Sequence, residues 1–427
     1  MAEASDPAGD NTALTIRAAA TGERDLVARV RSRCYRPKYA HEAAMRESTA
    51  ADRGDVAAGD MLLAERGGRF IATLTCLRGE MSVRGKVFAC NGIAYVGTTH
   101  DARRSGGVAS KIMFAALDLA RERGEVLSAL MPFRASYYEH FGYGLCERRL
   151  NWTVPIPILP SAPRGTELSH QFVEPSDAKM VRQLAEVRRR QFESADLGHG
   201  DVMFPHAVAD GVRHWADYYA ESGYLFVDLA DDGTARGWIG TIPTNRGDRL
   251  GLDVQHMIYD SPAGLLRHLN FLATLRDQYG YVDFATPADV AINTLLKETQ
   301  LPHRPVQHEH ADCRMTARNQ VRVLDHLKLL DGLPLAGEGK VIVCVKETEG
   351  HESRFAINAS DGHCEASSSE STPQFTCPDK VWAQIVLGET RATFASRHGL
   401  AQCDDESVLP MLDGFAQGPL PFCREYF

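Results

Sequence analysis

The sequence lacks three features that would point to particular classes of protein. No apolar run reaches the roughly 20 residues with which a helix crosses a bilayer. No two of the ten cysteines form a CxxC pair, and basic residues do not exceed acidic ones, at 47 against 56. A net charge of -9 argues against a nucleic acid as the main partner. We therefore expect no membrane partner, no nucleic-acid partner, and free thiols in a reducing compartment.

The N-terminal stretch MAEASDPAGDNTALTIR also lacks a basic region followed by an apolar one. We expect no signal peptide, a cytoplasmic location, and a disordered lead over residues 1–13. The remaining composition, 44% hydrophobic and 24% charged over 427 residues, is ordinary for a globular protein. That length predicts two or three domains.

The first third of the chain alternates between strand and helix patterns. Apolar strand patterns cover residues 61–66, 70–78 and 93–99, and a helix pattern runs from about residue 107 to 122. A further strand pattern covers residues 126–131. Strand–helix–strand order indicates an α/β layer.

A boundary and a second unit follow. The proline-rich stretch VPIPILPSAPRG, residues 154–165, indicates the boundary. Beyond it, the helix pattern of residues 261–280 and the strand pattern YVDFATP, residues 281–287, repeat the earlier plan. We infer a degenerate internal duplication from this pattern, not from sequence identity. Short strands and helices near the end of the chain indicate an α+β unit with no obvious site of its own.

The stretch IAYVGTTHDARRSGGVASKIM, residues 93–113, is the richest in chemistry. A strand leads into a turn with two arginines and two glycines, and a helix follows at once. Glycine permits positive φ, the N–H groups at a helix start bind phosphate oxygens, and arginine can hold a pyrophosphate. The turn is therefore a candidate pyrophosphate site, although its spacing matches neither a Walker A loop nor GxGxxG. The alternative is an ordinary glycine-containing connection with solvated arginines.

A second stretch, SYYEHFGYG, residues 136–144, follows the strand pattern VLSALMP. Its tyrosines and glycines lie at the C-terminal end of that strand, where ligands bind in open α/β sheets. A tyrosine can return a proton to a departing thiolate. The alternative is that these aromatic residues only pack the core.

Together the two stretches resemble the GNAT family of acetyl-CoA-dependent N-acetyltransferases, whose cofactor loop reads R/Q-x-x-G-x-G/A after a strand. The loop fits in two registers, which leaves its contacts open by one residue: Arg103-x-x-Gly106-x-Val108 and Arg104-x-x-Gly107-x-Ala109. From residue 14 to 427 the chain resembles more narrowly the Eis (enhanced intracellular survival) family, through this loop, YYEHFGYG, the two later units and the terminal Phe427. It departs from that family in having TTHD, residues 98–101, where a proline is usual before the arginines.

The Eis resemblance implies an α/β plus α+β fold with two GNAT-like units, the second degenerate, followed by a unit of sterol-carrier-protein fold. The implied units are residues 14–153, a linker over 154–167, residues 168–312 and residues 313–427. The resemblance also implies acetyl-CoA as co-substrate and a symmetric homo-oligomer, often a hexamer in this family. No metal is expected, because the stretch HRPVQHEHADC, residues 303–313, has no standard zinc spacing and is better explained as a polar linker. The acceptor would be a primary amine, of a polyamine, an aminoglycoside or a lysine side chain.

The same resemblance implies roles for individual residues. The backbone of Val96, Gly97 and Thr98 would pair with the pantetheine arm. The pyrophosphate would lie on Arg103, Arg104, Ser105, Gly106, Gly107, Val108 and Ala109, and the thiol end of the cofactor near Phe133 and Arg134. Tyr138, the first tyrosine of Y-x-x-F-G-Y-G, would be the general acid and the α-carboxylate of Phe427 the base.

The sequence leaves two alternatives to a GNAT enzyme with direct transfer: another function and another mechanism. The chain could be a lipid-binding protein that uses the third unit and keeps an inactive GNAT scaffold, which a thermal-shift comparison of acetyl-CoA with a fatty acyl ligand would distinguish. A covalent mechanism could use a cysteine, but Cys76 and Cys90 lie in apolar strand patterns, where cysteine is usually inert. We therefore expect direct transfer without an enzyme thiol.

Overall fold

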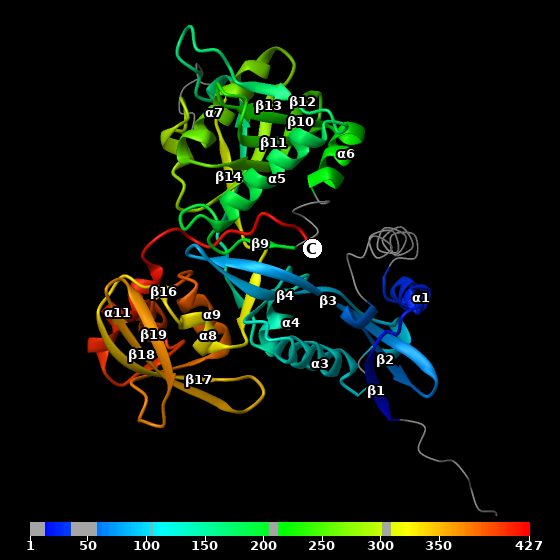
Figure 1. Cartoon of the computed structure of the whole chain (residues 1–427), viewed down its shortest axis with the longest axis vertical. Coiled ribbons are helices and arrows are strands. Elements are labelled where there is room, and N and C mark those ends of the chain that lie inside the picture. The colour runs from blue at the N-terminus through cyan, green and yellow to red at the C-terminus, as the bar shows by residue number, and fades with distance from the viewer. Residues whose placement is uncertain (1–12, 36–57, 104–105, 205–211, 301–308) are drawn as a thin grey trace, which may run out of the picture.

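The chain folds into three units, each built around its own sheet (Figure 1). The computed structural model describes residues 13–35, 58–103, 106–204, 212–300 and 309–427. Within these ranges no helix combines the length and the apolar character that crossing a bilayer requires.

The first sheet has the spatial order β1-β2-β3-β4-β5-β15-β6, and β9 adds to β3. The strands are β1 (Leu14–Ala18), β2 (Met61–Arg66), β3 (Arg69–Val83), β4 (Lys86–Thr98), β5 (Leu127–Leu130), β6 (Gly144–Leu145), β9 (Val202–Met203) and β15 (Gln320–Val323). Helix α1 (Arg24–Cys34) packs with Leu63 of β2, whereas α3 (Val108–Glu122) packs with the next residue on either side, Leu62 and Ala64. Because successive side chains of a strand point to opposite faces, α1 and α3 cover opposite faces of this sheet.

The second sheet repeats this plan, with the order β8-β10-β11-β12-β13-β7-β14. Its strands are β7 (Arg149–Pro155), β8 (His170–Phe172), β10 (Tyr224–Leu229), β11 (Ala235–Arg246), β12 (Arg249–Tyr259), β13 (Tyr281–Pro287) and β14 (Asp312–Thr316). Helices α5 (Ala178–Glu193), α6 (Val212–Ser222) and α7 (Pro262–Leu272) belong to this unit. Along the main order each sheet has one parallel neighbour pair, β4–β5 in the first and β12–β13 in the second, at the same place. The topology therefore agrees with the duplication inferred from the sequence.

The two sheets exchange a strand. β7 follows the first unit in sequence but lies beside β13 of the second sheet, and β15 follows the second unit but lies beside β5 of the first. The predicted boundaries therefore differ from the strand arrangement. The predicted end of the first unit is residue 153, but residues 149–155 form a strand of the second sheet. The predicted start of the third unit is residue 313, but the unit begins only after Val323. The reason is physical: the pattern of a strand shows that it pairs but not with which distant edge.

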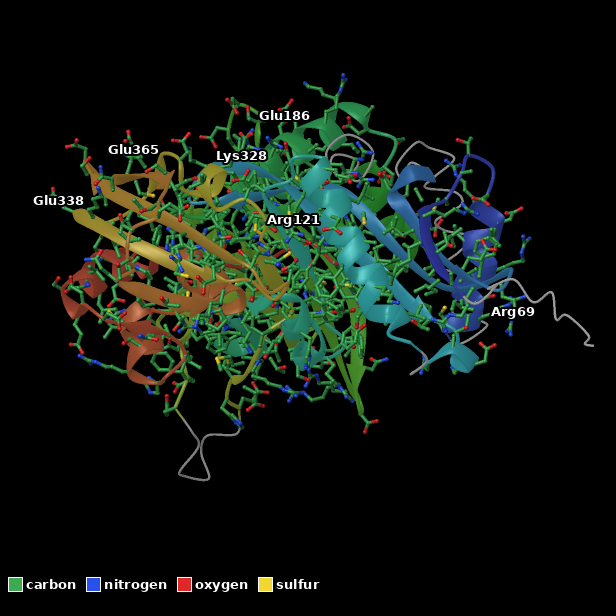
Figure 2. All side chains as sticks on the ribbon, turned by 90° about the horizontal axis from the view of Figure 1, so that it is seen from below. Arg69, Arg121, Glu186, Lys328, Glu338 and Glu365 are labelled. Atoms are coloured by element: carbon green, nitrogen blue, oxygen red, sulfur yellow. The ribbon has the colours of Figure 1, made fainter. Side chains whose placement is uncertain are left out.

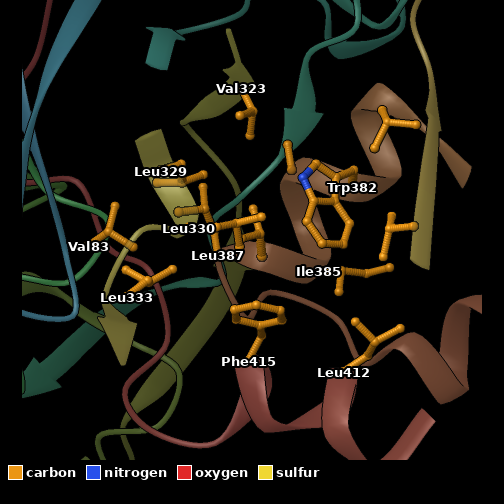
Figure 3. Packing of buried hydrophobic residues seen from close by; sticks show 14 of the residues in the cluster. Val83, Val323, Leu329, Leu330, Leu333, Trp382, Ile385, Leu387, Leu412 and Phe415 are labelled. Atoms are coloured by element: carbon orange, nitrogen blue, oxygen red, sulfur yellow. The ribbon is translucent and has the colours of Figure 1, made fainter. Parts of the chain in front are cut away.

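The third unit is an α+β layer with sheet order β16-β19-β18-β17-β20-β21. It contains β16 (Leu333–Pro334), β17 (Gly339–Lys346), β18 (Glu352–Ser360), β19 (His363–Ser368), β20 (Phe375–Pro378), β21 (Gln402–Cys403), α8 (His326–Leu330), α9 (Asp379–Val386), α10 (Ala392–Arg397) and α11 (Leu409–Asp413). Trp382 packs on Phe355 and Phe415, at ring distances of 5.5 and 6.2 Å. Val83 of β3 belongs to the same buried cluster (Figure 3), so the third unit and the first sheet share one core.

The last ten residues, 418–427, form neither helix nor strand and are called the tail below. The tail leaves the third unit, passes along the side of the second unit that faces the first sheet, and ends beside β9 (Figure 1). Phe422 and Cys423 within it are almost fully buried. The tail is thus a packed part of the molecule.

Candidate active site

The candidate site begins where the parallel pair β4–β5 opens. The two strands pair from Cys90 and Leu127 to Ile93 and Leu130. β4 then continues to Thr98, and no described strand pairs with this extension on the β5 side. We call this gap the strand opening. The predicted pantetheine residues 96–98 all lie along it, on a strand edge that the sheet leaves unpaired.

A bulge in β4 marks the start of the opening. Three steps along β4, from Ala94 to Gly97, face two steps along β3. Within it Tyr95 has φ +53°, a left-handed conformation that non-glycine residues rarely adopt. Bulges concentrate next to active sites, where they redirect backbone groups. The carbonyl of Val96 accepts a hydrogen bond from the Tyr35 hydroxyl at 2.7 Å and is therefore not used by the sheet.

The end of α1 packs closely against this part of β4. A Cβ atom on Gly97 would lie 2.7 Å from the Cβ of Cys34, so the close approach of the helix requires glycine there. Arg103 of the following loop reaches toward the carbonyls of Thr98 and Cys34, at 3.5 and 3.4 Å. The loop, the strand and α1 are thereby held together on one side of the opening.

The glycine loop leads directly into α3. Gly106 and Gly107 have φ of +63° and +65°, and α3 begins at Val108 without a side-chain cap. The first N–H groups of Val108 and Ala109 therefore have no partner within the helix, as a phosphate site requires. The predicted residues Arg104 and Ser105 lie outside the described residues.

Arg66, at the end of β2, is a neighbour of this loop that the sequence did not reveal. Its guanidinium would lie 2.9 Å from a Cβ atom built on Gly106. The strand pattern MLLAER predicted β2 correctly, but nothing in it indicated that its last residue lies against a loop forty residues later. Arg66 and Arg103 thus both bring positive charge to the loop.

Tyr138 ends the short helix α4 (Ala135–Tyr138) directly beyond β5. Its ring packs edge-on against Phe133 and Tyr137, at 5.7 and 5.0 Å, and the residue is 5% exposed. Among the described residues none hydrogen-bonds its hydroxyl. Burial, with smaller contributions from Tyr137 and Tyr35, raises the pKa of Tyr138 well above the usual value of 10.0. The hydroxyl therefore keeps its proton at neutral pH.

Tyr143, the second tyrosine of the motif, has a different environment. It is fully buried, and its hydroxyl lies 2.6 Å from Ser128 Oγ, which in turn donates to the carbonyl of Asn91. Tyr143 therefore fixes β5 against β4 through a closed hydrogen-bond chain. Of the two tyrosines, Tyr143 has its hydroxyl bonded within the described part of the chain and Tyr138 does not.

Phe133 and Arg134 lie at the mouth of the opening, between β5 and α4. Phe133 is 75% exposed, which is unusual for a large apolar side chain. Arg134 is also exposed, and its carbonyl accepts from the backbone of Tyr137 at 3.1 Å. Both predicted residues are thus exposed at the end of β5 that adjoins the opening, and their contact with a cofactor stays a prediction.

Phe427 lies on the α1 face of the first sheet. Its ring packs edge-on on Phe204 at 5.0 Å, and the Phe204 ring in turn fills the space that side chains at Gly79 and Gly92 would occupy. Gly92 pairs with Ala129 of β5, one step before the opening. Gly92 and Ala94 lie on the same face of β4, because side chains two residues apart in a strand point the same way. This is the α1 face, since Arg31 of α1 hydrogen-bonds to Thr75, which is paired with Ala94. The tail therefore ends close to the strand opening.

Among the described residues, further candidates for chemistry are Glu125, two buried cysteines and an acidic cluster. Burial raises the pKa of Glu125 to about 7, but Glu125 precedes β5 and so lies at the opposite end of that strand from Tyr138. Burial also raises the pKa of Cys76 to about 12 and that of Cys90 above its usual value, so burial favours the protonated thiol at both positions. Of the described acidic side chains, one group of three lies close enough to share an ion, and it already surrounds the guanidinium of Arg322: Glu347, Glu349 and Asp379.

Known proteins share this fold. A GCN5-related N-acetyltransferase from Anabaena variabilis is 17% identical and has a TM-score of 0.80, over 97% of this chain and 100% of that one. One from Kribbella flavida is 20% identical with a TM-score of 0.76, over 98% and 99%. Eis1 from Mycobacterium abscessus is 18% identical with a TM-score of 0.76, over 97% and 100%. At these identities the likeness shows the three-unit fold. No curated protein sequence matches the chain significantly.

The first unit has a closer assignment. Residues 15–146 match the family model of the acetyltransferase (GNAT) domain, a range that contains the strand opening, the glycine loop and Tyr138. The chain therefore carries a GNAT acetyltransferase domain. The match assigns this first unit to the acetyltransferase (GNAT) domain family.

Proposed function

We propose that the chain is an acetyl-CoA-dependent N-acetyltransferase of the Eis type that acetylates primary amines by direct transfer. Tyr138 is the general acid and the α-carboxylate of Phe427 is the base. The observation that carries this proposal is the position of the tail, which ends on Phe204 against β4, one step before the strand opening.

The cofactor fits the chemistry of the opening and its loop. The backbone edge at Val96–Thr98 can pair with the amides of a pantetheine arm, and Gly106, Gly107 and the uncapped start of α3 offer N–H groups to a pyrophosphate. Arg103 adds positive charge, as does Arg66, and we keep Arg104 and Ser105 as predicted members of the loop. Bound acetyl-CoA supplies the acetyl group as a thioester.

Two groups of this chain handle the protons. A primary alkylamine has a pKa near 10.4 and is an ammonium ion at neutral pH, so a proton must leave before it can attack a carbonyl. A terminal carboxylate, ionised above roughly pH 3.7, attracts that ammonium and can accept its proton, directly or through water. Tyr138, which burial keeps protonated, returns a proton to the departing sulfur.

The acceptor is proposed at the level of its chemical class: a primary amine of a polyamine, an aminoglycoside or a lysine side chain. The remaining expectations stay predictions, namely a cytoplasmic homo-oligomer, often a hexamer in the Eis family, and a sterol-carrier-protein fold for the third unit. Light scattering of the purified chain tests the oligomer.

The test is release of CoA from acetyl-CoA in the presence of a panel of amines. We expect turnover with primary amines of the proposed class and none with their fully N-acetylated or fully quaternary counterparts, which have no proton to lose from a nucleophilic nitrogen. Absence of CoA release with every primary amine, in a preparation that acetyl-CoA stabilises against heat, would contradict the proposal.

A further inference from the structure

The second unit keeps the strand opening of the first. β12 and β13 pair only from Gly251 to Asp253, although β12 continues to Tyr259. Directly beyond the last pair, two steps along β12 face one along β11, which leaves Gln255 as the extra residue of a bulge. In the first unit the pairs likewise stop at Ile93, and the bulge follows at Tyr95.

The second opening lacks the means to hold a pyrophosphate. Only Asp260 and Ser261 separate β12 from α7, and α7 begins with Pro262, which has no N–H to offer. The Asp260 carboxylate, 3.0 Å from the Ser261 hydroxyl, places negative charge at the helix start. The arginine–glycine loop of the first unit thus has no equivalent here.

The tail lies at this second opening. The space between the separated ends of β12 and β13 is lined by both strands, by Arg149 and Arg318, and by Phe422 and Arg424 of the tail. The Arg149 guanidinium lies over the Phe422 ring, 4.2 Å from its centre, and also donates to the carbonyl of Cys423. The second unit therefore presents to the tail the place that corresponds to the candidate cofactor site of the first.

Buried charges hold the tail at several points. Asp201, fully buried, accepts from Arg188 at 2.7 Å and from the backbone N–H of Arg424 at 2.8 Å. Arg188 also reaches the Glu425 carboxylate at 3.4 Å. Arg318 donates to the carbonyls of Cys423 and Glu425, at 3.3 Å each. These bonds fix the tail up to two residues before Phe427.

We propose that the second unit is the positioning device for the chain end, with Arg188, Asp201 and Arg318 as positioning residues. By holding residues 422–425 it sets where the Phe427 carboxylate lies relative to the strand opening of the first unit. The inference rests on the proposed function for what that carboxylate does. A misplacement of about 1 Å in a reacting group can cost about 10²-fold in rate, so looser holding acts on turnover.

The test uses the full chain with the substitutions Arg318→Ala and Asp201→Asn. Arg236→Ala is the control, because Arg236 is a half-buried arginine of the same unit that pairs with Asp228 and has no contact with the tail. Two quantities are measured: amide hydrogen exchange of residues 419–427 without substrates, and kcat with KM for acetyl-CoA. If Asp201→Asn does not fold, the test relies on Arg318→Ala, because Arg318 is only half-buried.

We expect faster exchange in the tail, a kcat lowered about 10²-fold and an unchanged KM for acetyl-CoA, with the control like the native chain. Arg318→Lys, which keeps one donor, should recover part of kcat. Unchanged protection of the tail in both variants would overturn the holding role, and a freely exchanging tail with native kcat would overturn the positioning role. If a glycine appended after Phe427 leaves both kcat and tail protection intact, the carboxylate is not the base, and the failure belongs to the proposed function instead.

Discussion

At the scale of single residues, Tyr138 and Tyr143 of the same motif differ in their hydrogen bonds. The Tyr143 hydroxyl is used in a buried chain with Ser128, whereas no described group bonds the Tyr138 hydroxyl. The sequence motif alone cannot distinguish them, because both are aromatic, adjacent to glycine or helix, and buried. Their hydrogen-bond partners decide which one can donate a proton to a substrate.

Replacing Tyr138 by Phe removes the proton and keeps the ring packing. We expect kcat to fall about 10²- to 10⁴-fold, the usual contribution of a general acid, while calorimetry gives a nearly unchanged Kd for acetyl-CoA. Tyr143→Phe is the matched control: it should lose about 1 kcal/mol of stability with its hydrogen bond and keep kcat. The reverse pattern would assign the acid to Tyr143.

Glu349 links the first and third units by charge. Its carboxylate accepts from Arg322 of β15 and from Arg121 of α3, the latter at 2.8 Å, and Figure 2 labels Arg121 on that helix. Burial alone would raise the pKa of Glu349, but the two guanidinium groups outweigh it and lower the pKa from 4.5 to about 2. A carboxyl whose pKa is lower in the folded than in the unfolded state stabilises the fold above the unfolded value.

Glu349→Gln should therefore lower the free energy of unfolding at pH 7, by about 1 to 2 kcal/mol. This is less than a value of about 1.4 kcal/mol per unit of pKa shift would give, because the residue is exposed and solvent screens its ion pairs. The difference from the native chain should shrink as the pH falls from 4.5 toward 2, as denaturant unfolding at a series of pH values can measure. Glu352→Gln, which breaks an exposed pair with Arg354 on β18, is the control with little expected effect. A loss that is constant with pH would show that packing, not charge, is what Glu349 contributes.

The glycine loop is the element whose geometry can be tested most directly. A side chain on Gly106 would be strained by its φ of +63° and would lie 2.9 Å from Arg66 Nη2. We expect Gly106→Ala to raise the Kd for acetyl-CoA at least about tenfold in calorimetry, since the N–H groups at the start of α3 must be presented without distortion.

Gly124 supplies the control at the other end of α3. It has φ +73°, and a Cβ atom there would meet nothing within 4 Å. Gly124→Ala should therefore carry a similar backbone strain, of roughly 1 to 2 kcal/mol, without affecting the Kd. Equal effects of the two substitutions on binding would place the phosphate site away from the loop.

Local pattern predicted the elements better than their bounds or their partners. The helix pattern of residues 261–280 covers α7, which ends at Leu272, and a separate 3-10 helix, Ala273–Asp277. The strand pattern YVDFATP gives β13 residue for residue, and MLLAER gives β2, because alternation and apolar runs are properties of the segment itself. The exchange of β7 and β15 between the sheets could not be seen, since edge pairing depends on segments more than a hundred residues away. For the same reason the sequence indicated Tyr138 and Phe427, through motifs, but neither Arg66 nor Phe204, whose roles come only from what they touch.

At the scale of the whole molecule, shared cores and the C-terminal tail connect the three units. The third unit shares its core with β3 of the first, and its end continues as the tail across the second unit and back to the first sheet. The third unit, which has no evident site of its own, thus supplies the tail that Arg188, Asp201 and Arg318 hold. Under the proposed function, the active site therefore combines the GNAT domain with the end of the chain.

Variants of the chain end can distinguish two roles of Phe427: a carboxylate that acts as the base, and a ring that only packs. We compare the native chain, a chain without Phe427, and a chain with one glycine appended after it. The appended glycine keeps the Phe427 ring, which packs on Phe204, but moves the carboxylate by about 3.3 to 3.6 Å along an extended chain. Packing needs the ring and not the charge, so it predicts full activity for the extended chain.

A carboxylate base predicts that both altered chains bind acetyl-CoA and turn over far more slowly. The glycine-extended chain should also keep the fold and a protected tail, because the bonds at residues 422–425 are untouched. The measurement is kcat across a range of pH, so that a base with a shifted pKa is not mistaken for a lost one. Native kcat in the extended chain at every pH would rule out the terminal carboxylate and leave Phe427 as a packing residue, with the proton taken by water or by a group elsewhere in the opening.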